Sequence, residues 1–175
     1  MKSIITIILS LIVGICISQT KLDSIVFEKV NQYRIEKGLK EVKFDTACYK
    51  ASKHHTSYLY TKNIITWPKS FCGHSEDTLV DFTNRYEFYA PKKRYLHLAE
   101  VALSISKNYK ISDTLLLEKI STEIVNGWKS SPNHNKILLG SDFVFSGVNC
   151  QYFTKPCGIN SILNYRIVAT MLFLK

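Results

Sequence analysis

The stretch Trp128-Lys-Ser-Ser-Pro-Asn-His-Asn-Lys-Ile-Leu-Leu139 decides the fold. It joins the end of a helical pattern, marked by the bulky Trp128, to a turn that presents His134. Pro132 disfavours helical geometry at Ser131, so the preceding helix should stop there. The apolar residues 137–139 predict a short anchor in the core, and we expect Trp128 to be buried as well.

Before this turn lies the clearest helical pattern in the chain. Between Ser112 and Trp128, apolar residues recur at the spacing that places them on one helix face. Ser112 and Asp113 have side chains suited to cap the first turn. The predicted buried stripe consists of Leu116, Ile120, Ile124 and Trp128.

Two longer helices are expected in the N-terminal half. Residues 22–37 carry apolar side chains at helical spacing, and Gly38 follows them at a position where a helix end favours glycine. Residues 39–44 alternate apolar and charged side chains and should run extended. They lead into Asp45, which can cap a second helix that ends near Thr61.

Several polar residues in this half are predicted to be structural. His54 and His55 are adjacent on the second helix and therefore point about 100° apart, so one should face solvent and the other should pack inward. A further helical piece is expected at 76–86. Glu76 and Asp77 stand at its N-terminus, where negative charge is favoured, so we interpret both as caps.

The C-terminal part has the composition of strands. Residues 143–153 and 162–174 are rich in aromatic and β-branched side chains, and Gly158 and Asn160 lie between them. This pattern predicts two antiparallel strands joined by a loop. The second is apolar nearly throughout, as expected for a central strand covered on both faces. Helices first and strands last indicate an α+β sandwich.

Length and composition are those of an ordinary globular protein. The chain has 175 residues, of which 46% are hydrophobic and 21% charged, so an intrinsically disordered chain is excluded. We expect a single domain over residues 22–175. The formal net charge of +9 favours association with anionic surfaces, although it selects no specific partner and no nucleic acid is expected. The densest basic cluster is Lys92-Lys93-Arg94.

The first eighteen residues resemble a secretory signal. Met-Lys is followed by an uncharged apolar run from Ile4 to Ile17 and by a small residue, Ser18, near which cleavage is expected. Two alternatives remain: a retained membrane anchor, and a lipoprotein acylated at Cys16. No second apolar stretch is long enough to cross a membrane. The sequence thus predicts a secreted or extracytoplasmic protein of the cell envelope or periplasm.

Removal of this signal leaves four cysteines, an even number that indicates disulfides in an exported chain. The preferred pairing joins Cys150 to Cys157 across a short loop between the two strands. It also joins Cys48 to Cys72, tying the second helix to the segment that carries His74. The alternative is reduced, buried cysteines.

One carboxylate lies inside an apolar run, at Glu100 within residues 96–103. A charge in such surroundings is costly unless it is paired, so we expect Glu100 to have a partner. With His74 and His134 it is predicted to line a polar cleft. A groove for a lipid-like ligand could be lined by aromatic residues, although such residues more often belong to the core: Trp67, Phe71, Tyr86, Phe88, Tyr89 and Tyr95.

Several motifs in their order resemble the CAP superfamily, also called SCP domains, in its bacterial secreted branch. They are residues 30–39, the Ala-Ser-Lys-His-His-Thr helix, His74-Ser75, Ala99-Glu100, Ile124 to His134, and Ser146-Gly-Val. The resemblance implies a three-layer α-β-α sandwich with a central antiparallel sheet and a cleft lined by two histidines and a glutamate. His74, Glu100 and His134 match these positions. Ser131 stands where animal and plant members have a second glutamate.

Two function classes follow for this cleft. The resemblance favours a secreted binding or interaction protein, with a lipid-like ligand, an anionic surface or a divalent metal as its target. Two imidazoles and a carboxylate could hold zinc, with His74 and His134 as ligands, or could form a metal-free hydrogen-bond network. The alternative is a metal- or glutamate-assisted hydrolase acting on peptide or cell-wall material. Ser75 and Ser131 each neighbour a cleft histidine, but neither lies in a nucleophile elbow.

Overall fold

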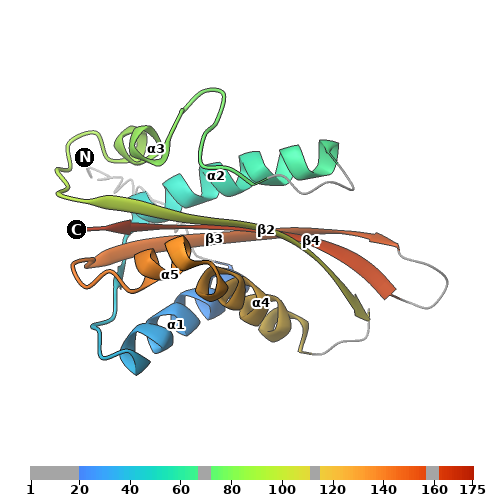
Figure 1. The fold of residues 1–175 in the computed structure, drawn as a ribbon. Coiled ribbons are helices and arrows are strands. Elements are labelled where there is room, and N and C mark those ends of the chain that lie inside the picture. Colours follow the sequence, from blue (N-terminus) through green and yellow to red (C-terminus); the bar gives the residue numbers. More distant parts are fainter. Residues whose placement is uncertain (1–19, 67–71, 111–114, 157–161) are drawn as a thin grey trace, which may run out of the picture.

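A four-stranded sheet lies between two layers of helices (Figure 1). The structure, a computed structural model, describes residues 20–66, 72–110, 115–156 and 162–175. The predicted α+β class and three-layer arrangement are confirmed. The elements in chain order are α1 (Lys21–Glu36), β1 (Lys43–Phe44), α2 (Thr46–Ile65), α3 (Phe82–Tyr89), β2 (Leu98–Lys110), α4 (Leu116–Ser130), α5 (Pro132–Leu138), β3 (Phe145–Pro156) and β4 (Ile162–Leu174).

The strand order is β1-β3-β4-β2, so β4 is central and β2 is an edge strand. β4 pairs antiparallel with both β2 and β3 along its whole length. The two-residue β1 pairs parallel with the start of β3, so the sheet is mixed and not purely antiparallel as predicted. Ten consecutive residues of β4, from Tyr165 to Leu174, are buried because both faces of this strand are covered.

The two faces of the sheet have different helical covers. In Figure 1, α2 and α3 lie on one face, and α1, α4 and α5 lie on the other. Side chains of β4 alternate accordingly: Met171 and Phe173 join the core with Trp128 of α4, whereas Leu172 and Leu174 pack with the start of α2. The predicted core position of Trp128 is thus confirmed.

Asp23 fixes the start of α1 against the sheet. The Thr20 hydroxyl accepts from the Asp23 amide, and Asp23 Oδ2 accepts from the Thr20 amide, which forms a capping box. The buried Asp23 carboxylate also accepts from the Cys150 amide of β3 at 2.7 Å and from the Asn149 side chain. Burial raises the pKa of Asp23, and these hydrogen bonds oppose that rise.

The end of α1 positions α5. The buried Arg34 donates to the carbonyls of Leu138 (2.6 Å) and Gly140 (3.0 Å), and Tyr33 donates from its hydroxyl to Asn135 Oδ1. The two Arg34 bonds satisfy backbone carbonyls at the end of α5 and just after it. Gly38 follows α1 with φ 75°, as the expected helix-end glycine should.

One predicted helix start is wrong, and one helix was predicted as a turn. Glu76 and Asp77 cap no helix, because α3 begins at Phe82 and is capped by Asp81, which accepts from the Asn84 amide. Pro132 ends α4 but also begins α5, where it occupies a first-turn position that needs no amide donor. His134 is therefore presented by a short helix and not by a turn.

Other predicted helix boundaries agree more closely with the structure. Asp45 caps α2 as predicted, by accepting from the Ala47 and Cys48 amides, but the helix continues one turn past Thr61 to Ile65. In the predicted stripe of α4, Ile120, Ile124 and Trp128 are buried as expected, and Leu116 is partly buried. The predicted caps of α4, Ser112 and Asp113, and the predicted signal peptide, residues 1–18, lie outside the described residues.

The predicted Cys48–Cys72 disulfide is absent, because both residues are free cysteines. The backbone of Cys48 lies against Gly147, which is aligned through β4 with Glu100 of β2. Cys72 instead accepts from the amide of Ser104. Four residues of strand separate these two positions, about 13 Å, which is more than a disulfide can span.

The predicted position of Cys150, at the start of the loop between the last two strands, is also wrong. Cys150 does not open the loop between the last two strands, because β3 continues for six more residues to Pro156. Cys150 is a buried free cysteine, and its predicted partner Cys157 lies outside the described residues. Among the described helices, none combines the length and apolar composition needed to cross a membrane.

Close packing of α2 on β3 gives a direct stability test. A Cβ at Gly147 would stand 2.2 Å from the Tyr49 nitrogen, which is backbone and cannot move aside. We predict that Gly147→Ala lowers the free energy of unfolding by about 3 kcal/mol in a denaturant titration.

The matched control is Gly127→Ala in α4, whose new Cβ would meet only the flexible Leu103 side chain, at 3.0 Å. Because alanine favours helices, its effect should stay within about 1 kcal/mol. Equal losses in the two variants would contradict the proposed α2–β3 contact.

Candidate functional site

Glu100 lies on β2 and points to the sheet face that α2 and α3 cover. Its neighbours on that face, Leu98 and Ala102, belong to the apolar packing there, and Glu100 itself is buried. Arg85 donates to its Oε2 at 2.6 Å, and His74 Nδ1 lies 2.9 Å from its Oε1. The prediction that Glu100 has a partner is confirmed, because both Arg85 and His74 contact it.

Arg85 is the cation that makes this burial possible. It comes from α3, is fully buried, and lies between two carboxylates: Glu100 at 2.6 Å and Glu76 at 3.2 Å. The same guanidinium donates to the carbonyls of His74 and Leu79. It therefore also holds the loop that carries His74.

His55 supplies a second contact to Glu76 from the middle of α2. Its Nδ1 lies 2.8 Å from Glu76 Oε1, and its Nε2 lies 2.6 Å from the carbonyl oxygen of Gly73. A carbonyl and an ionised carboxylate can only accept, so a ring that bonds both must donate from both nitrogens. This geometry fits a buried imidazolium. His54 approaches the other oxygen of Glu76, at 3.2 Å.

These contacts form one charge-balanced network. The carboxylates of Glu76 and Glu100 are matched by the guanidinium of Arg85 and the imidazolium of His55. A buried pair of charges is tolerated only when each charge is compensated and hydrogen-bonded. The network thus links α2, α3 and β2 through buried polar atoms, and its outer end, at His54 and Glu76, borders a surface hollow of about 430 Å³.

The two histidines predicted for the cleft are brought together. The ring centroids of His74 and His134 lie 6.1 Å apart in an edge-to-face arrangement, at the β2 edge of the sheet. The side chain of His74 is 45% exposed. In the neutral ring, an Nδ1–H that donates to Glu100 leaves the lone pair of Nε2 for a ligand.

His134 is half-buried on α5. Its Nδ1 is buried and has no hydrogen-bond partner among the described residues. Burial lowers the pKa of His134 below the ordinary histidine value, and the neighbouring His74 lowers it further. His134 is consequently neutral at physiological pH.

The neighbouring serines do not complete a catalytic arrangement. Ser75 is exposed, and Ser131 is half-buried between α4 and α5. Neither hydroxyl makes a hydrogen bond to a histidine in the described part of the chain. A nucleophilic serine would require such contact with a base.

The predicted aromatic groove is only partly formed. Tyr86 is fully buried and packs edge-to-face against Tyr95, so it cannot line an open groove. Tyr89 is half-buried and lies in a surface groove, and Phe88 is exposed. Trp67 and Phe71 lie outside the described residues.

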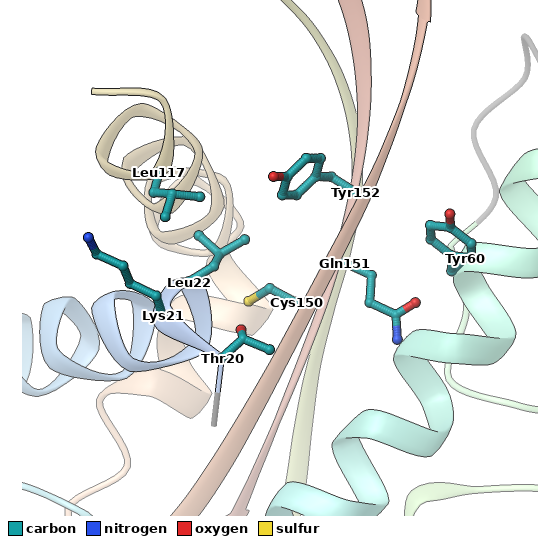
Figure 2. Close-up of a pocket in the computed structure, with 8 residues that line it drawn as sticks. All are labelled: Thr20, Lys21, Leu22, Tyr60, Leu117, Cys150, Gln151 and Tyr152. Carbon is teal, nitrogen blue, oxygen red and sulfur yellow. The ribbon is translucent and has the colours of Figure 1, made fainter. Parts of the chain in front are cut away.

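A separate pocket of about 390 Å³ lies where the starts of α1 and α4 meet β3 (Figure 2). Figure 2 shows Cys150 and Tyr152 directed toward α1 and α4, and Gln151 directed to the opposite side with Tyr60. Burial raises the pKa of the Cys150 thiol well above its usual range, so this sulfur stays protonated. We assign no chemistry to this pocket.

The prediction that one of His54 and His55 packs inward is confirmed, because His55 is fully buried. Sequence reasoning missed the roles of Glu76 and Arg85 in the network. One signal could have indicated Arg85. It lies among aromatic residues in a helical stretch, where a buried guanidinium without a partner would be costly. Glu76 was interpreted as a helix cap because acidic residues commonly begin helices. Only the long-range contact with α2 distinguishes the two roles.

Comparison with known proteins identifies the family. The model of the cysteine-rich secretory protein family, CAP, matches residues 27–165. The chain belongs to the CAP family. The matched region contains His74, Glu100 and His134, and it confirms the resemblance found in the sequence. A comparison with curated proteins found no match.

Two bacterial structures share the CAP fold with this chain. An outer surface protein from Borrelia burgdorferi has a TM-score of 0.60 at 16% identity, covering 91% of this chain and 96% of that one. An extracellular SCP-domain protein from Bacillus anthracis has a TM-score of 0.59 at 18% identity, covering 88% of this chain and 40% of that one. This chain therefore spans less than half of the Bacillus protein. At these identities the likeness shows the fold alone.

The donor set does not fit a resident catalytic zinc. Such sites use three protein ligands and leave one position open. Across the described residues, no group of three or more His, Cys, Asp or Glu side chains is placed to hold a metal. Glu100 cannot be counted, because Arg85 and His74 occupy both of its oxygens. The pair provides two imidazole ligands, and any further donor would have to come with the ligand.

The buried network predicts a large loss of stability when its guanidinium is removed. Arg85→Met leaves two buried carboxylates opposite one imidazolium, so the free energy of unfolding should fall by about 3–5 kcal/mol in a denaturant titration. The control is Lys29→Met, which breaks the partly exposed pair with Glu118 and should cost less than about 1 kcal/mol. Similar effects of both substitutions would contradict the network.

The state of His134 predicts a pH dependence. Because its folded pKa lies below the ordinary value of 6.5, its contribution to stability is complete above about pH 6.5 and is lost as the pH falls below that value. In a histidine NMR titration, His134 should titrate below 6.5. His74→Ala should raise this midpoint without fully restoring the ordinary value, because burial remains. A midpoint at or above 6.5 in the unaltered protein would contradict this assignment.

Proposed function

We propose that this CAP protein is an extracytoplasmic binding protein whose ligand contacts His74 and His134. The supporting observation is that both oxygens of Glu100 are occupied, by Arg85 at 2.6 Å and by His74 at 2.9 Å. Glu100 thus orients His74 and is not available as a general base. The site presents two adjacent imidazoles for binding, and the described residues around them leave no carboxylate free.

The two imidazole rings favour a ligand that accepts a nitrogen lone pair, as a metal ion does. A carboxylate behind a histidine fixes its tautomer and makes the outer nitrogen a better metal ligand. We therefore propose a divalent transition metal ion, tested as zinc, held by His74 and His134 together with donors supplied by the bound ligand. The predicted signal over residues 1–18 supports placement outside the cytoplasm.

The hydrolase alternative would need a group that this site does not leave free. Glutamate-assisted hydrolysis would require Glu100 to be released from Arg85. The position of a second glutamate in other members of the family is Ser131 here, whose hydroxyl cannot replace a carboxylate as a base. These observations favour binding over hydrolysis.

Zinc titration by calorimetry tests the proposal on protein that begins at Gln19. The unaltered protein should bind zinc, and His74→Ala and His134→Ala should each weaken binding at least about tenfold, the scale of losing one metal ligand's support. His97→Ala is the control, because that histidine is exposed and pairs with Asp142 instead. Absence of zinc binding, or its retention in both variants, would contradict a metal at this pair.

A second assay separates binding from catalysis. Peptide, ester and cell-wall substrates should show no turnover by the unaltered protein. Turnover that His134→Ala abolishes would overturn the assignment as a binding protein.

A further inference from the structure

One end of the sheet carries several exposed apolar side chains. The backbone bonds Lys43 to Val144, Val144 to Leu174, and Leu96 to Lys175 run across all four strands at this end. Leu96 is 84% exposed, and Val144 is exposed as well. The strand residues Phe44 and Phe145 at this end are also exposed, whereas Leu98 and Leu174 beside them are buried. In Figure 1 this end is the one where β4 finishes, at the label C.

A groove of about 330 Å³ adjoins this end on the α2 side. Tyr89, Ala90 and Pro91 form its apolar part, and Lys50 and Lys92 border it. The groove is continuous with the sheet end because Lys93 in its wall contacts Asp45, which follows β1, at 2.7 Å. Phe88, next to the groove, is 64% exposed.

The charge at this end remains positive after its ion pairs are counted together with the exposed Glu87, which accepts from the Tyr95 hydroxyl at 2.9 Å. Asp45 is neutralised by Lys93, and Asp142 lies 3.7 Å from Lys175 and 3.3 Å from His97. By contrast, Lys92 and Arg94 are exposed and form no ion pair with any described residue. The exposed apolar side chains of Phe88 and Leu96 therefore lie on either side of the unpaired basic residues Lys92 and Arg94 in the sequence.

We propose that this sheet-end surface, formed by Phe88 to Leu96 with Phe44, Val144 and Phe145, docks on an anionic lipid bilayer. Apolar side chains beside lysine and arginine are the combination that binds the boundary between lipid headgroups and acyl chains. The basic residues are attracted to anionic headgroups, while Leu96 and Phe88 enter the interface.

Other occupants fit this surface less well. A second copy of the chain would bring Lys92 and Arg94 against the same basic residues, which is unfavourable. A soluble anionic polymer would engage the basic side chains but leave the apolar side chains in water. Only a bilayer offers negative charge and an apolar layer at the same boundary.

The surface is distinct from the His74–His134 pair, so its test does not depend on the proposed ligand. The experiment is co-sedimentation with vesicles of phosphatidylcholine containing roughly 30% phosphatidylglycerol, a typical anionic composition, and with pure phosphatidylcholine vesicles. Protein beginning at Gln19 is used, so that the apolar residues 4–17 make no contribution. This protein keeps every described element, because α1 begins at Lys21 and is capped by Thr20.

Binding should occur on the anionic vesicles and weaken with added salt. Lys92→Glu combined with Arg94→Glu should reduce the partition coefficient by about fivefold or more for each residue changed. Leu96→Ser should reduce it about tenfold by removing a buried apolar side chain at unchanged charge. His74→Ala should bind as the unaltered protein does.

The matched controls are Ile65→Ser and Lys110→Glu, which make the same kinds of change at the ends of α2 and β2 that lie away from this surface. Both should bind normally. Circular dichroism verifies that each variant is folded. The proposal is overturned if the unaltered protein does not bind anionic vesicles, if Leu96→Ser has no effect, or if the controls lose as much binding as the variants.

Discussion

The bond between Arg85 and Glu100, 2.6 Å long and fully buried, is the constraint on which the site depends. A carboxylate in the middle of an apolar strand face would be too costly without a cation at this position. Arg85 also contacts the buried carboxylate of Glu76, and that carboxylate is in turn bonded to His55. The polar network is therefore a single unit, and each member justifies the burial of the next.

This unit determines what the exposed histidine can do. Glu100 is held on one side by Arg85, so its other oxygen is fixed in place to receive His74. His134 reaches the same point from α5, whose position follows from the bonds that Arg34 and Tyr33 of α1 make to it. Two imidazoles thus meet at the sheet edge through supports that come from opposite faces of the sheet. Such support suits recognition of a ligand.

Much of the fold could be predicted from periodicity, because the signals are local. The stripe of α4, the cap at Asp45 and the unbroken apolar character of β4 each reflect one element and its own burial. The family resemblance placed His74, Glu100 and His134. Glu76 was misinterpreted because its partner, His55, lies 21 residues away and faces it only after α2 packs on the sheet. The Cys48–Cys72 pairing failed for a similar reason. Cys48 lies against Gly147 of β3 and Cys72 against Ser104 of β2, and the distance between these positions is set only when the sheet forms.

The most direct test of the account is the tautomer of His74 at neutral pH, read from nitrogen chemical shifts in an NMR spectrum. If Glu100 is an ionised, Arg85-bound acceptor, His74 must carry its proton on Nδ1, and this preference should disappear in Glu100→Ala. Ser75→Ala, next to His74 and without a bond to it, should leave the tautomer unchanged. A proton on Nε2 in the unaltered protein would show that Glu100 does not orient His74, and the central claim would be wrong.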